Sequence, residues 1–82
     1  MNKEHVLLHL REGLEELERT ISDIESVPDY DEGEFRVAME HLYSHVNTAW
    51  NARNIAPDRV TNHSRSDFSA WRSFPADLDL SR

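Results

Sequence analysis

The chain has 82 residues, of which 38% are hydrophobic and 30% charged, so it can form one domain with a modest core. Chains of this length are marginally stable alone and often oligomerise, and without cysteine this one has neither disulfides nor a thiolate metal cage. The formal charge of −7, from 16 acidic and 9 basic residues, argues against direct binding to nucleic acid or to an anionic membrane.

The N-terminal segment MNKEHVLLHLREG has an apolar run of only a few residues, which His9 and Arg11 interrupt. Both the core of a signal peptide and a membrane-spanning helix need longer apolar runs than this. We therefore expect a soluble protein of the cytoplasm that does not insert into membranes.

Leucine and isoleucine recur in the first third of the chain at alternating steps of three and four residues. Their positions are Leu7, Leu10, Leu14, Leu17, Ile21 and Ile24. This 3.5-residue repeat is typical of the seam of a coiled coil. Pro28 cannot continue a helix, and it pushes Val27 towards an extended backbone. The pattern predicts a helix over about residues 3–26.

The segment PDYDEGEF predicts a turn, after which Asp31 caps a second helix with Glu34 as the partner of a capping box. A second seam with the same spacing follows. Its positions are Phe35, Met39, Leu42, Val46, Ala49 and Arg53. The second helix is expected over about residues 32–54, ahead of Pro57.

Two seams of similar length joined by a short turn predict an antiparallel helical hairpin over residues 1–56. A register in which facing residue numbers sum to about 60 brings small residues together and sets His45 opposite Gly13. It also forms three pairs on the other edge: Arg36 with Glu25, Tyr43 with Glu18, and Trp50 with Arg11. One hairpin cannot cover so wide an apolar face, so we expect an all-α homodimer in which two hairpins form a four-helix bundle. A tetramer would bury the same seams.

Residues 57–82 differ from the hairpin, since a polar stretch precedes aromatic residues at a helical spacing. Ser64 and Asp67 have the pattern of a capping box, and Pro75 would end the helix, so a short helix is expected near residues 65–73. Its aromatic face carries Phe68, Trp71 and Phe74. We expect that face to dock on the hairpin, because exposed aromatic clusters are a liability. A free recognition tail is the alternative.

Histidines four residues apart can supply two metal ligands from one helix face. His41 and His45 have this spacing, and Glu15 and Glu18 on the first helix are the natural further donors. We expect these histidines to be surface and packing residues instead, since helix geometry alone brings residues four apart together. The expectation is thus no metal and no cofactor, with those four residues as the candidates for a metal site.

The segment REGLEELER gathers Glu12, Glu15, Glu16 and Glu18, and clustered carboxylates on bundle helices can hold magnesium. In this cluster the chain resembles the all-α nucleotide pyrophosphohydrolases, which would imply magnesium-dependent phosphate chemistry. The middle of the second helix, AMEHLYSHV, has no matching acidic motif. A solvated helix face explains the cluster more simply.

The sequence shows no nucleophile elbow, glycine-rich phosphate loop or Ser/His/Asp arrangement. We therefore expect a non-enzymatic helical protein that acts through self-association and partner binding, with a basic protein as a further partner of its acidic surface. The residues expected to contact a partner are Tyr43, Trp50, Phe68, Trp71 and Phe74. A bundle that binds a metal or small ligand is the second hypothesis, and a magnesium-dependent nucleotide phosphohydrolase is the third.

Overall fold

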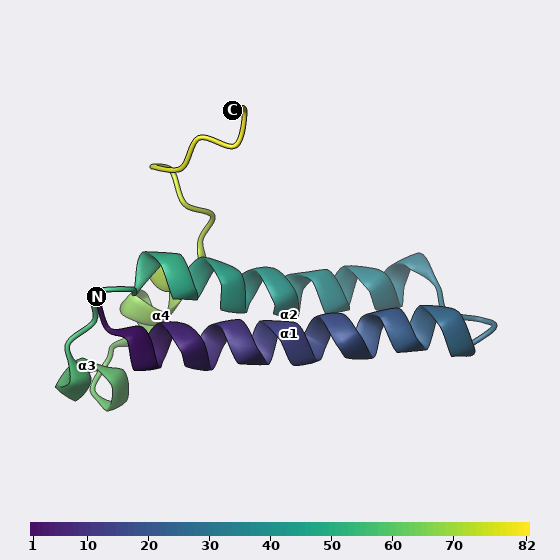
Figure 1. Ribbon diagram of the computed structural model, residues 1–82, viewed down its shortest axis with the longest axis horizontal. Coiled ribbons are helices and arrows are strands. Elements are labelled where there is room, and N and C mark those ends of the chain that lie inside the picture. Colours follow the sequence, from purple (N-terminus) through teal and green to yellow (C-terminus); the bar gives the residue numbers. More distant parts are fainter.

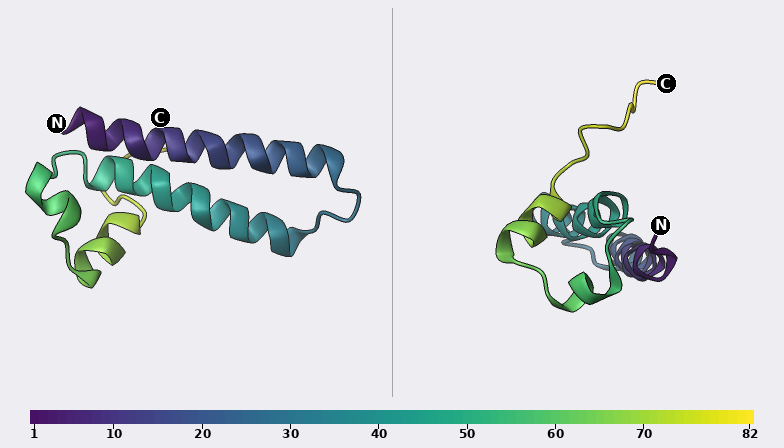
Figure 2. Two further views of the ribbon diagram at one scale, coloured as in Figure 1. Left: turned by 90° about the horizontal axis from the view of Figure 1, so that it is seen from below. Right: turned by 90° about the vertical axis from the view of Figure 1, so that its left-hand side faces the viewer.

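The computed structural model describes residues 1–82 and contains four helices and no strand, so the expected all-α class is confirmed (Figure 1). The helices are α1 (Lys3–Ser26), α2 (Glu32–Asn51), α3 (Pro57–Thr61) and α4 (Arg65–Arg72). α1 and α2 lie side by side and antiparallel, and α3 and α4 both lie on one side of this hairpin (Figure 2). None of the four helices has both the length and the apolar character needed to cross a bilayer.

The ends of α1 follow from its local sequence. The Asn2 side chain caps the helix by accepting a hydrogen bond from the His5 backbone N–H. The helix ends at Ser26, as predicted, because Val27 is extended ahead of Pro28.

The ends of α2 depart slightly from the prediction. Asp31 caps the helix by accepting a hydrogen bond from the Glu34 N–H at 2.9 Å, but no return bond from the Glu34 side chain completes a capping box. The helix ends at Asn51 rather than near residue 54, because the backbone turns over residues 52–54.

α1 and α2 contact each other through small and polar residues. The buried residues of these helices are His5, Gly13, Thr20, Asn47, Thr48 and Ala49. A Cβ added at Gly13 would lie 3.7 Å from Leu42 Cδ1 and 3.8 Å from His45 Cβ, so an alanine would fit and a larger side chain would separate the helices. The predicted position of His45 opposite Gly13 is confirmed. Three pairs of residues in contact, 12 with 45, 16 with 41 and 2 with 55, have numbers that add up to 57, close to the predicted sum of about 60.

The seam of α1 does not form this contact, although the sequence suggested that it would. Of the α2 seam, Leu42 Cδ1 and Val46 Cγ2 do reach it, at 3.7 and 3.9 Å from a Cβ added at Gly13. All six seam residues of α1 are exposed, over a range from 40% for Leu17 to 54% for Leu14 and Ile21. A helix turns by about 100° per residue, so Leu14 and Leu17 lie roughly a quarter turn away from the direction in which Gly13 and Thr20 face α2. The small-residue edge therefore takes the position that the leucine seam was expected to occupy.

The pairs predicted on the other edge of the hairpin are wrong for the same reason. The four ion pairs of the structure do not include Arg36 with Glu25. Tyr43 packs edge-on against Phe74 instead of lying beside Glu18, and the ring of Trp50 is covered by Arg53 rather than Arg11. With the helices joined at the small-residue edge, these side chains lie on outward surfaces and cannot meet within one chain.

The single chain has almost no hydrophobic core. Only Ala49 and Ala52 are buried hydrophobic residues, and no large side chain is fully buried. Burying a leucine or isoleucine side chain contributes about 1.5–3 kcal/mol, and here that contribution is largely unused along both seams. One hairpin thus leaves most of its large hydrophobic side chains at the surface.

α4 docks on α2 through hydrogen bonds rather than through its aromatic face. Its predicted capping box of Ser64 and Asp67 is present. At its other end, Asn51 Nδ2 donates to the carbonyls of Trp71 and Ser73, and Asn47 Nδ2 donates to that of Arg72. These carbonyls have no partner within the helix, so the two asparagines of α2 satisfy the C-terminal end of α4. Phe68 and Phe74 remain 46% and 71% exposed.

We predict that removing both amides releases α4 from the hairpin. In the double variant Asn47→Ala and Asn51→Ala, partly buried carbonyls lose their donors, at a cost of about 1–3 kcal/mol. Amide hydrogen exchange over residues 65–72 should become about tenfold faster or more, while exchange in α1 stays unchanged. Asn54→Ala is the control, because Asn54 is exposed and makes no side-chain hydrogen bond. Unchanged exchange in the double variant would show that other contacts hold α4.

Candidate functional site

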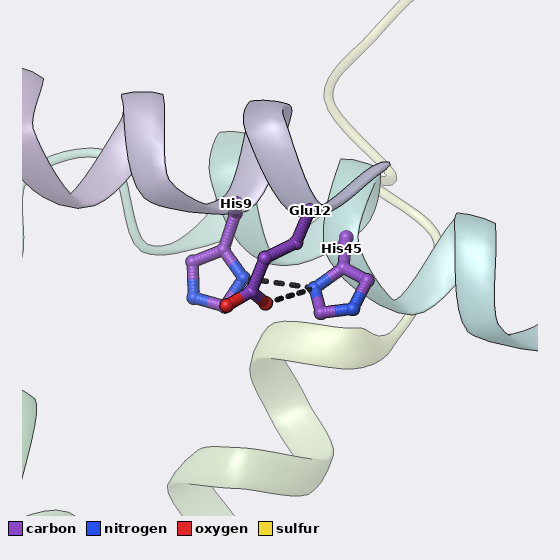
Figure 3. Close-up of side chains that lie close together, drawn as sticks. All are labelled: His9, Glu12 and His45. Atoms are coloured by element: carbon purple, nitrogen blue, oxygen red, sulfur yellow. Dashed lines mark hydrogen bonds and ion pairs between the residues drawn. The ribbon is translucent and has the colours of Figure 1, made fainter. Parts of the chain in front are cut away.

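A cluster of two histidines and a glutamate lies in the groove between α1 and α2 (Figure 3). His9 Nδ1 is 3.2 Å from His45 Nδ1, and His45 Nδ1 is 3.1 Å from Glu12 Oε2. One donor atom from each of the three residues lies within 4.8 Å of the others, and all three side chains are half-buried. We call these residues the histidine cluster.

Helix geometry explains how the histidine cluster forms. His9 and Glu12 are three residues apart on α1, so their side chains share one face. His45 reaches them from α2 because Gly13 has no side chain to keep the two helices apart. The cluster therefore depends on the small-residue contact of the hairpin, and both helices hold its members in place.

The hydrogen bonding of the histidine cluster is crowded at one atom. His45 Nδ1 is the near neighbour of both Glu12 Oε2 and His9 Nδ1. A neutral imidazole carries a proton on only one of its two nitrogens, so a single proton at His45 Nδ1 has to serve both contacts. Alternatively, the proton is on His9 Nδ1 and is donated to His45 Nδ1. The Glu12 carboxylate then faces the lone pair of an unprotonated His45 Nδ1. The three donor atoms thus converge without enough protons to satisfy every pair.

His5 extends the cluster by one helical turn towards the N-terminus. Its ring meets that of His9 edge-on, with 4.6 Å between the centroids. His5 is 7% exposed, and its Nδ1 is buried without any hydrogen-bond partner. Buried polar atoms are nearly always satisfied, so this nitrogen marks an incomplete polar environment.

Burial lowers the pKa of His5 below its ordinary value of 6.5, and the nearby His63 lowers it further. Burial also lowers the pKa of His9, with added repulsion from His5 and His45, while the Glu12 carboxylate partly opposes the shift. Both imidazoles are therefore neutral near pH 7 and keep a nitrogen lone pair available as an acceptor or ligand.

The candidate metal ligands of the sequence do not assemble as a group. His45 belongs to the histidine cluster, but His41 Nδ1 lies one turn away, 3.8 Å from Glu16 Oε1. Glu15 and Glu18 are exposed and pair with neither histidine. The predicted register, with the leucine seam facing α2, places Glu18 beside Tyr43 of α2. Because the small-residue edge faces α2 instead, the carboxylates beside that edge approach the histidines.

The aromatic candidates contact other parts of the same chain. Tyr43 and Phe74 meet with 5.2 Å between ring centroids, and Trp50 Nε1 donates a hydrogen bond to Asp77 Oδ1 at 3.0 Å. That bond lowers the pKa of the Asp77 carboxyl. Trp71 lies beside the ring of His63. The contacts of Tyr43 and Trp50 fasten the C-terminal segment to α2, whereas that of Trp71 with His63 lies within the segment. Beyond these contacts the chain runs away from the hairpin towards its C-terminus (Figure 1).

A second feature is a broad exposed apolar surface, which we call the apolar face. Its exposed members are seam residues: Leu7, Leu10, Leu14, Leu17, Ile21 and Ile24 of α1, and Phe35 and Val46 of α2. Met39 and Leu42 of α2 belong to it as half-buried members, whereas Ala49 is buried and Arg53 covers the ring of Trp50. On each helix the seam is displaced by about a quarter turn, in the same sense, from the residues that face the other helix. In an antiparallel pair this displacement brings both seams to one side of the hairpin. These residues belong to the two seams predicted from the sequence, but the predicted hairpin buries them between α1 and α2.

The apolar face is the side of the hairpin that α3 and α4 leave largely free. Arg72 of α4 donates a hydrogen bond to Ser44. Ser44 precedes Val46 by two residues, or about 200° around the helix, so α4 docks on the side of α2 opposite to Val46. The end-on view in Figure 2 shows α3 and α4 together on one side of the helix pair. Within the chain, Arg72 and Phe74 reach one edge of the apolar face, where they line a cavity together with Phe35 and Met39, whereas the seam residues of α1 stay exposed.

Comparisons with known proteins give no relative from which a function could be transferred. No protein-family model matches the chain, and neither the curated proteins nor the solved structures yielded a match. The histidine cluster and the apolar face are therefore interpreted from their own geometry and chemistry.

The lowered pKa values of His5 and His9 predict that stability falls as the pH is lowered. Between the lowered folded value and the unfolded value of 6.5, the unfolded chain binds more protons, so acid favours unfolding. In chelator-containing buffer, the melting temperature should drop from about pH 7.5 to about pH 5, a range in which mainly histidines titrate.

Two variants show whether these histidines cause that drop. His9→Gln should reduce the dependence of the melting temperature on pH, whereas His41→Gln should leave it unchanged. A melting temperature that is constant over this pH range, or the same pH dependence in both variants, would contradict the assignment.

Proposed function

We propose that this chain is a small non-catalytic protein that acts by self-association, with two hairpins joined through their apolar faces into a four-helix bundle. The observation that carries the proposal is the exposure of the entire α1 seam, together with Phe35 and Val46 of α2, in a chain with almost no core. Soluble monomers rarely expose contiguous apolar patches above a few hundred Å². A surface of this kind needs a partner.

The size of the apolar face suits a stable interface. About twenty helical residues are about 30 Å long, and two helices side by side are about 20 Å wide, which gives about 600 Å² before side-chain relief is counted. Standard interfaces bury about 800 Å² per partner. The face of one hairpin is thus comparable to one side of a typical dimer interface.

The chemistry of the apolar face favours a second copy of the same chain as its partner. Its positions are aliphatic or aromatic except for methionine, so two copies can bury it without leaving a charge unpaired. A 3.5-residue repeat on both helices is the pattern that interlocks side chains between neighbouring helices of a bundle. A two-fold dimer uses the same patch on both subunits, which a self-complementary apolar surface permits.

The proposed dimer leaves its acidic residues accessible. Glu15 and Glu18 of α1 are exposed and lie off the seam, so they would remain at the surface of the bundle. With a net charge of −7 per chain, this surface suits a basic protein as a further partner. Such a partner would bind the assembled bundle rather than replace one hairpin.

Two valines on α2 provide a matched test of the apolar face. Val46 is 43% exposed on the face, and Val37 is 49% exposed nine residues earlier, about 180° around the helix. Sedimentation equilibrium of the unchanged chain should give twice its 9.6 kDa mass. Val46→Glu should abolish the dimer, because a charge would be buried in the interface, and Val37→Glu should preserve it.

Circular dichroism of the same samples shows whether the hairpin stays helical when the dimer is lost. If the hairpin needs its partner, Val46→Glu loses helicity together with the dimer, and Val37→Glu retains both. A fully helical monomer in all three samples would end the homodimer proposal and leave the apolar face to a different protein or to a bilayer surface. Equal dimerisation of both variants would show that another surface forms the interface.

A further inference from the structure

The histidine cluster has the composition and geometry of a metal site. We propose that His9, Glu12 and His45 bind one divalent transition-metal ion of the zinc class per chain. Two imidazole nitrogens and one carboxylate oxygen form a common three-ligand set for zinc, with the fourth position open to water. The inference uses contacts within one hairpin, so it is independent of the proposed dimer.

Two of the three donor separations match those of tetrahedral coordination, and the third, between His9 and Glu12, is below 4.8 Å. Zinc–nitrogen and zinc–oxygen bonds of about 2.0–2.1 Å give about 3.3 Å between neighbouring ligand atoms of a tetrahedron. The separation is 3.2 Å from His9 Nδ1 to His45 Nδ1 and 3.1 Å from His45 Nδ1 to Glu12 Oε2. Figure 3 shows the three side chains converging from the two helices. A cation could therefore be accommodated with small side-chain adjustments and no movement of the helices.

A cation also resolves the proton shortage at His45 Nδ1. One proton there has to serve both Glu12 and His9, whereas a metal ion accepts a lone pair from all three donor atoms at once. An independent sign of an incomplete polar site lies next to it, where the buried Nδ1 of His5 has no hydrogen-bond partner. The His5 ring packs on that of His9, so the unsatisfied nitrogen belongs to the immediate surroundings of the cluster.

The charges and ligand types indicate which metal class would bind. The carboxylate of Glu12 and the net charge of −7 favour a cation over an anion. Calcium and magnesium prefer several oxygen ligands, and the cluster supplies only one carboxylate. Imidazole nitrogens suit zinc, cobalt, nickel and copper, so the site should distinguish these ions from the alkaline-earth cations.

The test is a titration of the full-length, chelator-stripped protein with Zn²⁺ by calorimetry and with Co²⁺ by visible absorption. We expect one ion per chain with a dissociation constant in the micromolar range or below, and a four-coordinate Co²⁺ spectrum. His9→Gln, Glu12→Gln and His45→Gln should each weaken binding about tenfold or more. His41→Gln is the matched control, since His41 also lies on α2 beside a glutamate, and it should bind like the unchanged chain.

Several results would overturn the proposal. They are a Zn²⁺ dissociation constant weaker than about 100 µM in the unchanged chain, equal losses in the His41→Gln control and the cluster variants, or effective competition by millimolar Mg²⁺. A stoichiometry of one ion per two chains would place the site between subunits and contradict a site within one hairpin. His9 and Glu12 are only half-buried, so their variants decide the question even if His45→Gln does not fold, with circular dichroism as the check.

Discussion

The close approach of α1 and α2 at Gly13 controls the rest of the structure. Because this contact is made mainly by small and polar residues, only Ala49 and Ala52 are buried among the hydrophobic residues, and the α1 seam stays exposed. Helix pairs that meet along leucine seams hide their hydrophobic surface from water, whereas this pair leaves it available. The hydrophobic side chains that could stabilise the hairpin are present in its sequence, but they become buried only when the chain associates.

The same contact creates the histidine cluster. His45 can reach His9 and Glu12 because no side chain larger than a methyl group stands at Gly13 to separate the two helix backbones. The apolar face and the cluster are thus two consequences of one packing arrangement, and they lie more than about a third of a turn apart around α1. A metal ion bound there would join α1 to α2 directly, and would stabilise the arrangement that exposes the apolar face.

The helices and their register could be predicted because their signals are local. Pro28 ended α1, the Ser64 and Asp67 pair capped α4, and the size match between Gly13 and His45 gave the register. The rotation of the two helices could not be predicted. The leucine seam and the small-residue edge could each mediate the contact of α1 with α2, and no local pattern decides between them. With the small-residue edge facing α2, Glu12 and Glu16 lie beside the histidines in place of Glu15 and Glu18. HLREG holds part of the signal, because His9 precedes Gly13 by four residues and Glu12 by three.

If the bundle forms as proposed, folding and association are a single equilibrium, because the hairpin alone has almost no core. The most direct measurement is thermal unfolding of the unchanged chain, followed by circular dichroism at protein concentrations that span about a hundredfold range around the micromolar level. The proposed dimer predicts a melting temperature that rises steadily with concentration. A sharp, fully helical transition at one temperature across the whole range, from a species with the mass of a single chain, would contradict it.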